Sequence, residues 1–110
     1  MKTTKRARLK AAGWAVGDAA EFLSLSEEER AFVETKLALS AGVRERRQRQ
    51  RLTQAQVARR LGSSQSRVAK LEAADPSVSM DLMVRSLLRL GATRADIARL
   101  IQRRRRVGAV

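Results

Sequence analysis

The chain has no cysteine and no histidine among its 110 residues, and its aromatic side chains are one tryptophan and two phenylalanines. The first two absences exclude disulfide bonds, cysteine–histidine zinc sites, thiol nucleophiles and imidazole bases. The scarcity of aromatics argues against a single-strand binder that stacks bases on a series of rings. We therefore expect a non-enzymatic protein with no catalytic residues, no metal site and no cofactor.

Long apolar runs are also missing, so no segment is predicted to span a bilayer. The basic start, Met1–Lys10, is not followed by the apolar segment of a signal peptide. These features favour a cytoplasmic protein with no membrane association. Apolar residues make up 44% of the chain, which is enough for one modest core and one folded domain.

The charge is strongly basic and unevenly distributed. Lys and Arg number 24 against 11 Asp and Glu, a formal net charge of +13. Acidic residues gather between positions 18 and 34, whereas residues 44–70 carry nine bases and the single acid Glu45. The ends, 1–12 and 104–110, are predicted to be basic tails. This balance favours a polyanionic partner, with nucleic acid ahead of a membrane surface.

Capping patterns predict helices throughout, and no β-branched alternation is long enough for a strand. The single proline, Pro76, stands between two of these helices. The predicted helices run from Asp18 through Leu23, from Ser26 to about Gln50, from Thr53 to Leu61, from Ser63 or Ser64 to about Ala74, from Ser79 to Leu90, and from Thr93 into Arg103–Arg106. The expected fold class is all-α, with five helices preceded by a short N-terminal one.

The segment Gln54–Glu72, QAQVARRLGSSQSRVAKLE, has the residue types that a helix–turn–helix requires. Ala58 is small where the second helix must cross the first, and Gly62 tolerates a left-handed backbone in the turn. The inner faces carry apolar residues at helical spacing, namely Val57, Leu61, Val68 and Leu71. This full set, with capped helices and basic surroundings, indicates a DNA-binding unit.

The pattern resembles the lambda-repressor-like (Xre) helix–turn–helix family, on the residues Leu52-Thr53-Gln54, Val57-Ala58, Leu61-Gly62, Gln65-Ser66, Val68 and Leu71-Glu72. The resemblance extends from about Leu37 to Ile101 and implies a five-helix domain over residues 33–103. Residues 13–32 resemble the front extension of HigA-like antitoxins, on Gly13-Trp14, Glu21-Phe22-Leu23, Leu25-Ser26 and Glu28-Glu29. The stretch Arg44–Arg51 departs from the family pattern, because it carries more basic residues than the fold alone requires.

Helical phase predicts which side chains of the second helix could contact DNA. With Val68 and Leu71 inward, steps of about 100° per residue point Ser66 and Lys70 outward. Arg67 and Ala69 then lie on the flanks, and Gln65 at the exposed amino end. In the major groove Gln65 suits adenine, Arg67 or Lys70 suits guanine, and the Ala69 methyl suits thymine.

Other candidate DNA contacts are Ser64, Arg59 and Gln54. The resemblance implies that Gln54 binds a phosphate and braces Gln65, and a helix amino terminus favours phosphate. The ordinary alternatives are that Gln54 completes a cap with Thr53, that Ser66 is a first-turn helix residue, and that the basic residues are solvated charges. Glu72 is expected to pair with a nearby base rather than to contact DNA.

Two protein interfaces are also expected. The resemblance implies a homodimer on a pseudo-palindromic operator, and the candidate interface is Leu87, Leu90, Ile97, Leu100 and Ile101; these residues could instead all serve the monomer core. Trp14 and Phe22, beside an acidic run, could bind a basic toxin or could simply staple the extension to the long helix.

Three functions remain open from the sequence. The first is a DNA-binding repressor that acts as an antitoxin and represses its own operon. The second is a stand-alone regulator of the same fold, and the third is a basic module that associates with RNA or the ribosome.

Overall fold

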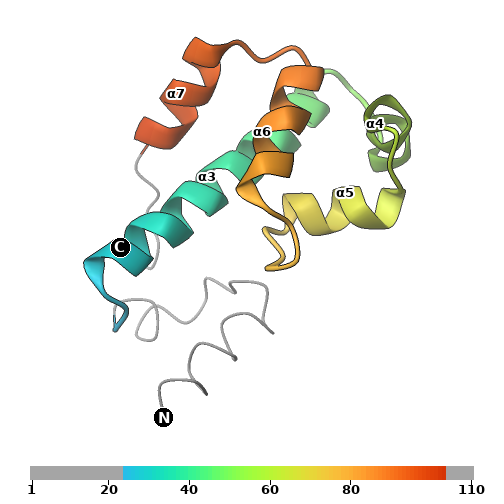
Figure 1. Cartoon of the computed structure of the whole chain (residues 1–110). Coiled ribbons are helices and arrows are strands. Elements are labelled where there is room, and N and C mark those ends of the chain that lie inside the picture. The colour runs from blue at the N-terminus through green and yellow to red at the C-terminus, as the bar shows by residue number, and fades with distance from the viewer. Residues whose placement is uncertain (1–23, 104–110) are drawn as a thin grey trace.

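The computed structural model describes residues 24–103, which form five helices and no strand (Figure 1). In chain order these are α3 (Glu27–Arg49), α4 (Gln54–Leu61), α5 (Gln65–Glu72), α6 (Met80–Arg89) and α7 (Arg94–Gln102). The predicted all-α fold is confirmed. None of the helices in this part of the chain is long and apolar enough to cross a membrane. The predicted helix from Asp18 through Leu23 and both predicted tails lie outside the described residues.

The long helix α3 is the element on which the others pack. It begins at a capping box, in which Ser26 Oγ accepts from the Glu29 backbone N–H and the Glu29 carboxylate accepts from the Ser26 N–H. Its 23 residues span roughly 34 Å at about 1.5 Å per residue. Helices α5, α6 and α7 all contact α3, and α7 lies at the opposite end of the molecule from α4 (Figure 1). α3 passes without interruption through position 33, the expected start of the helix–turn–helix domain.

The helix starts predicted within residues 24–103 are confirmed, because each depends on hydrogen bonds within one turn. Thr53 and Thr93 form capping boxes with Gln56 and Asp96. Ser64 rather than Ser63 caps α5, by accepting from the backbone N–H three residues later.

Two helix ends are formed by left-handed residues that are not glycine. Arg51 (φ 58°) and Ala74 (φ 56°) follow α3 and α5. At each, the next residue donates back across the last turn, with Leu52 N–H to the Arg47 carbonyl at 3.1 Å and Asp75 N–H to the Lys70 carbonyl at 2.9 Å. This closure ends α5 at Glu72, two residues before the predicted end.

The core lies where α3, α4, α5 and α6 meet. Its fully buried side chains come from all four helices and include Val43, Val57, Val68, Met83 and Leu87. Helix α7 contributes no fully buried residue, and only Ile97 and Leu100 pack partly against the core. The core therefore holds α5 firmly, whereas α7 lies at its margin.

We expect the two kinds of left-handed position to respond in opposite ways to mutation. Gly62 has φ 64°, and a methyl group added at its Cα would meet only open space, so Gly62→Ala should lower the free energy of unfolding by about 1 kcal/mol through backbone strain alone. Arg51→Gly should raise it by roughly 0.5 kcal/mol, because it removes the same strain. Urea unfolding of both variants tests this, and a stabilised Gly62→Ala would contradict it.

Candidate nucleic-acid interface

Helix α5 turns one face into the core and the other to solvent. Val68 and Leu71 are 0% and 1% exposed. The residues that helical phase placed outward or on the flanks are all exposed: Gln65, Ser66, Arg67, Ala69 and Lys70. The structure thus brings these five predicted DNA contacts together on one side of one helix.

The turn that sets the direction of α5 has the predicted form. Gly62 is left-handed (φ 64°, ψ 39°), and the next residue, Ser63, donates from its N–H to the Ala58 carbonyl at 2.8 Å. Ala58 is buried at the crossing of α4 and α5. Ser64 then caps α5, since its Oγ accepts from the Arg67 N–H at 3.1 Å. Its hydroxyl keeps a proton to donate and is exposed.

A polar network joins the start of α4 and the end of α5 to α3. Arg47 on α3 donates from Nε and Nη2 to the two carboxylate oxygens of Glu72, at 2.6 and 3.1 Å. Its Nη1 donates to the Leu52 carbonyl at 3.0 Å. Glu72 also accepts from the amide Nε2 of Gln54 at 3.1 Å. The expectation that Glu72 pairs with a nearby base is confirmed.

The hydrogen-bond partner of Gln54 is not Gln65, the partner that the resemblance implied. Its amide nitrogen is held by Glu72, the last residue of α5, while Gln65 is the first residue of that helix. The alternative of a cap shared with Thr53 is wrong, because Gln56 is the partner of Thr53, through bonds of 2.8 and 3.1 Å. Gln54 is therefore fixed by the network at the first position of α4 and remains partly exposed there.

Exposed basic side chains surround this helix pair. Arg59 and Arg60 are exposed on α4, and within residues 24–103 neither Arg59 nor Arg67 forms an ion pair. By contrast, Arg46 and Arg47 are tied to acids of other helices. Part of the basic stretch 44–51 thus stabilises the fold, which sequence reasoning missed because the acidic partners are distant in the chain.

The expected dimer interface needs correction at two residues. Leu87 and Leu90 are 0% and 3% exposed, because this face of α6 packs into the core. They have no surface to offer a second subunit. Ile97 and Leu100 are half-buried, whereas Ile101 is 47% exposed. Leu88, the next residue after Leu87 on α6, is also 47% exposed.

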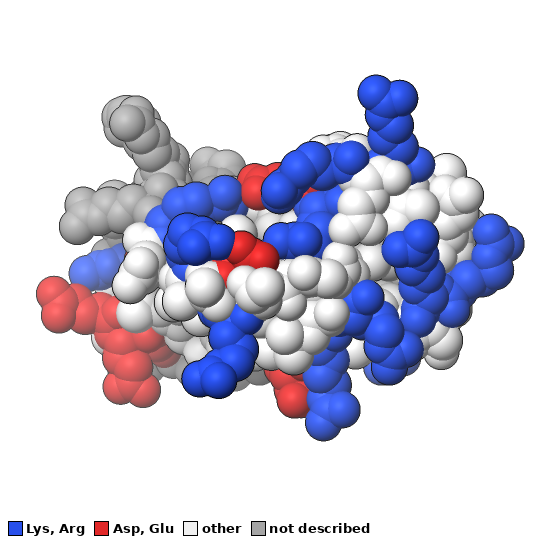
Figure 2. Space-filling view, turned by 90° about the horizontal axis from the view of Figure 1, so that it is seen from above, with Lys and Arg blue, Asp and Glu red and all other residues white. Residues whose placement is uncertain are grey.

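The predicted partner-binding residues Trp14 and Phe22 lie outside the described part of the chain. The nearby start of α3 is acidic, and its exposed residues include Glu27, Glu28 and the half-exposed Phe32. Figure 2 shows one group of acidic side chains at the left end of the face, while other acidic side chains lie among the lysines and arginines. Among residues 24–103, no three acidic side chains are grouped so that they could hold a metal ion.

Helix α4, the turn at Gly62, and helix α5 with one buried and one exposed face together form a helix–turn–helix. This arrangement defines a helix–turn–helix DNA-binding protein. A model of the helix-turn-helix domain family matches residues 38–100, more than half of the chain, and the chain belongs to that family. Neither the curated proteins nor the solved structures gave a significant match.

Removing one partner of the Arg47–Glu72 ion pair should be far more costly than removing both. The Glu72 and Arg47 side chains are only 5% and 15% exposed, so Glu72→Leu should cost about 3 kcal/mol by leaving a nearly buried guanidinium unpaired. The double variant Arg47→Met/Glu72→Leu should recover most of that loss, because no buried charge then remains. Chemical unfolding of Glu72→Leu, Arg47→Met and the double variant tests this. A double variant whose loss equals the sum of the two single losses would contradict it.

Proposed function

We propose that this protein is a sequence-specific DNA-binding repressor that acts in the cytoplasm and inserts α5 into the major groove with its amino end first. One observation carries the proposal, namely that Val68 and Leu71 anchor α5 while its whole opposite face is exposed. A two-turn helix held in this way fits the width of a major groove, about 12 Å. We assign the protein no catalytic role.

Specificity would come from four side chains of α5. Gln65 suits the N7 and N6 groups of adenine, and Arg67 or Lys70 the O6 and N7 acceptors of guanine. The Ala69 methyl group can lie against the thymine methyl. These side chains share one exposed surface, so a single approach of the helix can bring all of them to base edges.

Position on the duplex would come from phosphate contacts around α5. Ser64 at the N-cap and Ser66 in the first turn can donate hydroxyl protons, and Arg59 adds an exposed charge from α4. Gln54 adds an amide that Glu72 holds in place. Such contacts set register without conveying sequence, since they reach only the DNA backbone.

A second copy of the chain would complete the binding unit. One recognition helix contacts only a few base pairs, and two related by a two-fold axis contact half-sites about one helical turn apart. The exposed Ile101, with the half-buried Ile97 and Leu100, offers apolar surface on α7 for this contact.

The proposal is tested by selecting bound duplexes from a random pool and mapping the protected bases. We expect two phased half-sites. On the selected duplex Gln65→Ala should weaken binding by about 1–3 kcal/mol, the usual value of a bidentate base contact, whereas binding to a random duplex should change little. Titration by fluorescence anisotropy at one fixed salt concentration measures both. Equal losses on the two duplexes would refute the base contact.

Arg59→Gln provides the matched control for that experiment. We expect it to weaken both duplexes alike and to reduce the slope of log K against log salt by about 0.9, the value for one neutralised phosphate. A loss confined to the selected duplex would count against its assignment to the backbone.

We further propose that the protein is the antitoxin of a toxin–antitoxin pair, rather than a stand-alone regulator. The acidic start of α3, with the half-exposed Phe32, supports this, because a small basic toxin would find complementary charge there. This surface belongs to the end of α3 that is far from α4 (Figure 1), so toxin and DNA could bind together.

The antitoxin role predicts that a small basic protein encoded in the adjacent reading frame binds this chain. Glu27→Lys/Glu28→Lys should weaken that complex at least tenfold and leave DNA affinity unchanged or slightly higher, because only the toxin-facing charge is reversed. Calorimetry with the purified pair measures it. If no such neighbour is encoded, or if its product does not bind, the stand-alone regulator is the better assignment.

A further inference from the structure

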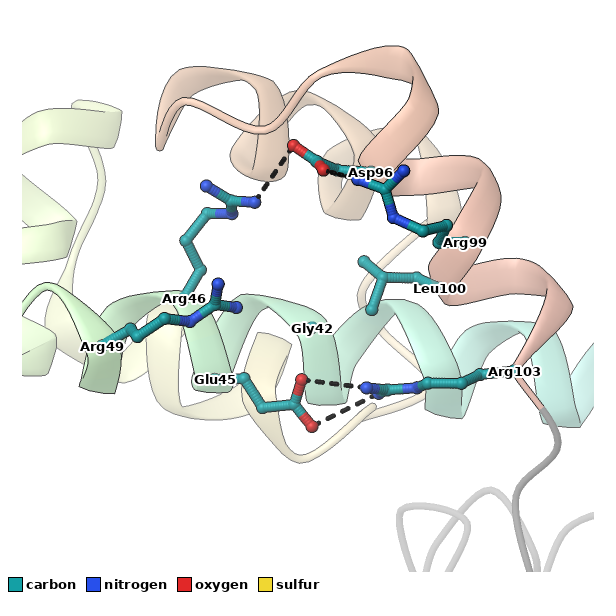
Figure 3. Close-up of a pocket in the computed structure, with 8 residues that line it drawn as sticks. All are labelled: Gly42, Glu45, Arg46, Arg49, Asp96, Arg99, Leu100 and Arg103. Carbon is teal, nitrogen blue, oxygen red and sulfur yellow. Dashed lines mark hydrogen bonds and ion pairs between the residues drawn. The ribbon is translucent and has the colours of Figure 1, made fainter.

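A pocket of about 300 Å³ lies between α3 and α7 (Figure 3). Its lining combines four arginines and two acids with a glycine and a leucine: Gly42, Glu45, Arg46, Arg49, Asp96, Arg99, Leu100 and Arg103. The volume is at the lower end of the range for small-molecule sites. Six of the eight lining residues are charged, which favours a polar occupant.

The two acids in the pocket are already satisfied by its arginines. Arg103 donates to both carboxylate oxygens of Glu45, at 3.1 and 3.3 Å. Asp96 accepts from Arg46 at 3.3 Å and also from Arg99. The backbone N–H of Thr93 bonds to Asp96 as well and holds the pKa of this carboxyl below its usual value.

The balance of charge leaves the pocket positive. Four guanidinium groups face two carboxylates, an excess of two positive charges. Within the described chain Arg49 has no ion-pair partner, and Figure 3 shows its side chain beside the paired Arg46 on α3. Arg49 is thus the cation most available to a bound anion.

The floor of the pocket is apolar and depends on a close approach of the two helices. Gly42 is buried on α3, and a Cβ at this position would overlap Leu100 of α7. The missing side chain therefore allows Leu100 to lie directly on the α3 backbone. Around this floor the guanidinium groups come from both helices, as Figure 3 shows.

We propose that this pocket binds a small phosphate-bearing ligand, such as a diphosphate or a phosphomonoester. A phosphate group carries two negative charges or nearly so at neutral pH and directs oxygens to several sides, which matches guanidinium groups arriving from two helices. A planar carboxylate would be satisfied by one of them. The ligand would connect α7, which has no fully buried residue, to α3.

Nucleic acid is the rival source of phosphate. The pocket is concave, and α7 lies on the other side of α3 from α4 and α5 (Figure 1). A duplex bound to α5 would thus have to bend around the protein before its phosphates could enter the pocket. A free, compact anion fits this location better than a strand of nucleic acid does.

The test is isothermal calorimetry of the full chain with inorganic pyrophosphate at constant ionic strength. We expect saturable binding of one anion per chain. Arg49→Gln should weaken it about tenfold, the effect of losing one charge-assisted hydrogen bond. The control is Arg44→Gln, which removes another exposed arginine of α3 that does not line the pocket. The control variant should bind pyrophosphate as the unmodified chain does.

Two results would overturn this assignment. Equal losses in Arg49→Gln and Arg44→Gln, or no saturation, would mean only general attraction of anions to a chain of net charge +13. If pyrophosphate fails to bind while Arg49→Gln weakens a random duplex and Arg44→Gln does not, the pocket instead contacts nucleic acid. Neither variant touches Gln65 or its neighbours, so the outcome is independent of the proposed base contacts.

Discussion

The burial of Val68 and Leu71 is the constraint on which the rest of the molecule depends. Helix α5 has only eight residues, and an isolated helix of that length is unstable in water. It is therefore helical because its inner face is in contact with α3 and α4 and is removed from water. The same contact decides which side chains face outward. Fold and candidate function thus have a common physical origin in two apolar residues three positions apart.

The helix starts were predictable from sequence because their causes are local. The side chains of Ser26, Thr53 and Thr93 each accept a hydrogen bond from the backbone N–H of the residue three positions later. The side chain of that later residue accepts one from the backbone N–H of the capping residue. The end of α4 at Gly62 was predictable for a similar reason, since glycine readily takes the left-handed conformation. Arg51 and Ala74, after α3 and α5, take the same conformation without being glycine. The residue types at these positions therefore did not indicate that a helix ends there.

Contacts between helices were less accessible to sequence reasoning. The phase of α5 followed from its own apolar spacing, because one buried pair fixes the orientation of a short helix. Helix α6 has apolar residues on more than one face, and only its packing against α3 decides that Leu87 is buried and Leu88 exposed. Arg47 likewise finds Glu72 25 positions away. The sequence indicated that Glu72 needs a base but could not say which of several arginines would reach it.

The separation of the two faces of α5 has a consequence for evolution. Mutations usually harm proteins by lowering stability below a threshold, which limits how fast a binding surface can change. Here the exposed side chains of α5 take no part in the core, and the network of Arg47, Gln54 and Glu72 supports the helix from behind. A lineage could therefore exchange the residues at 65, 67 and 70 with little risk of unfolding, and under the proposed function this exchange would change the DNA sequence that the protein prefers.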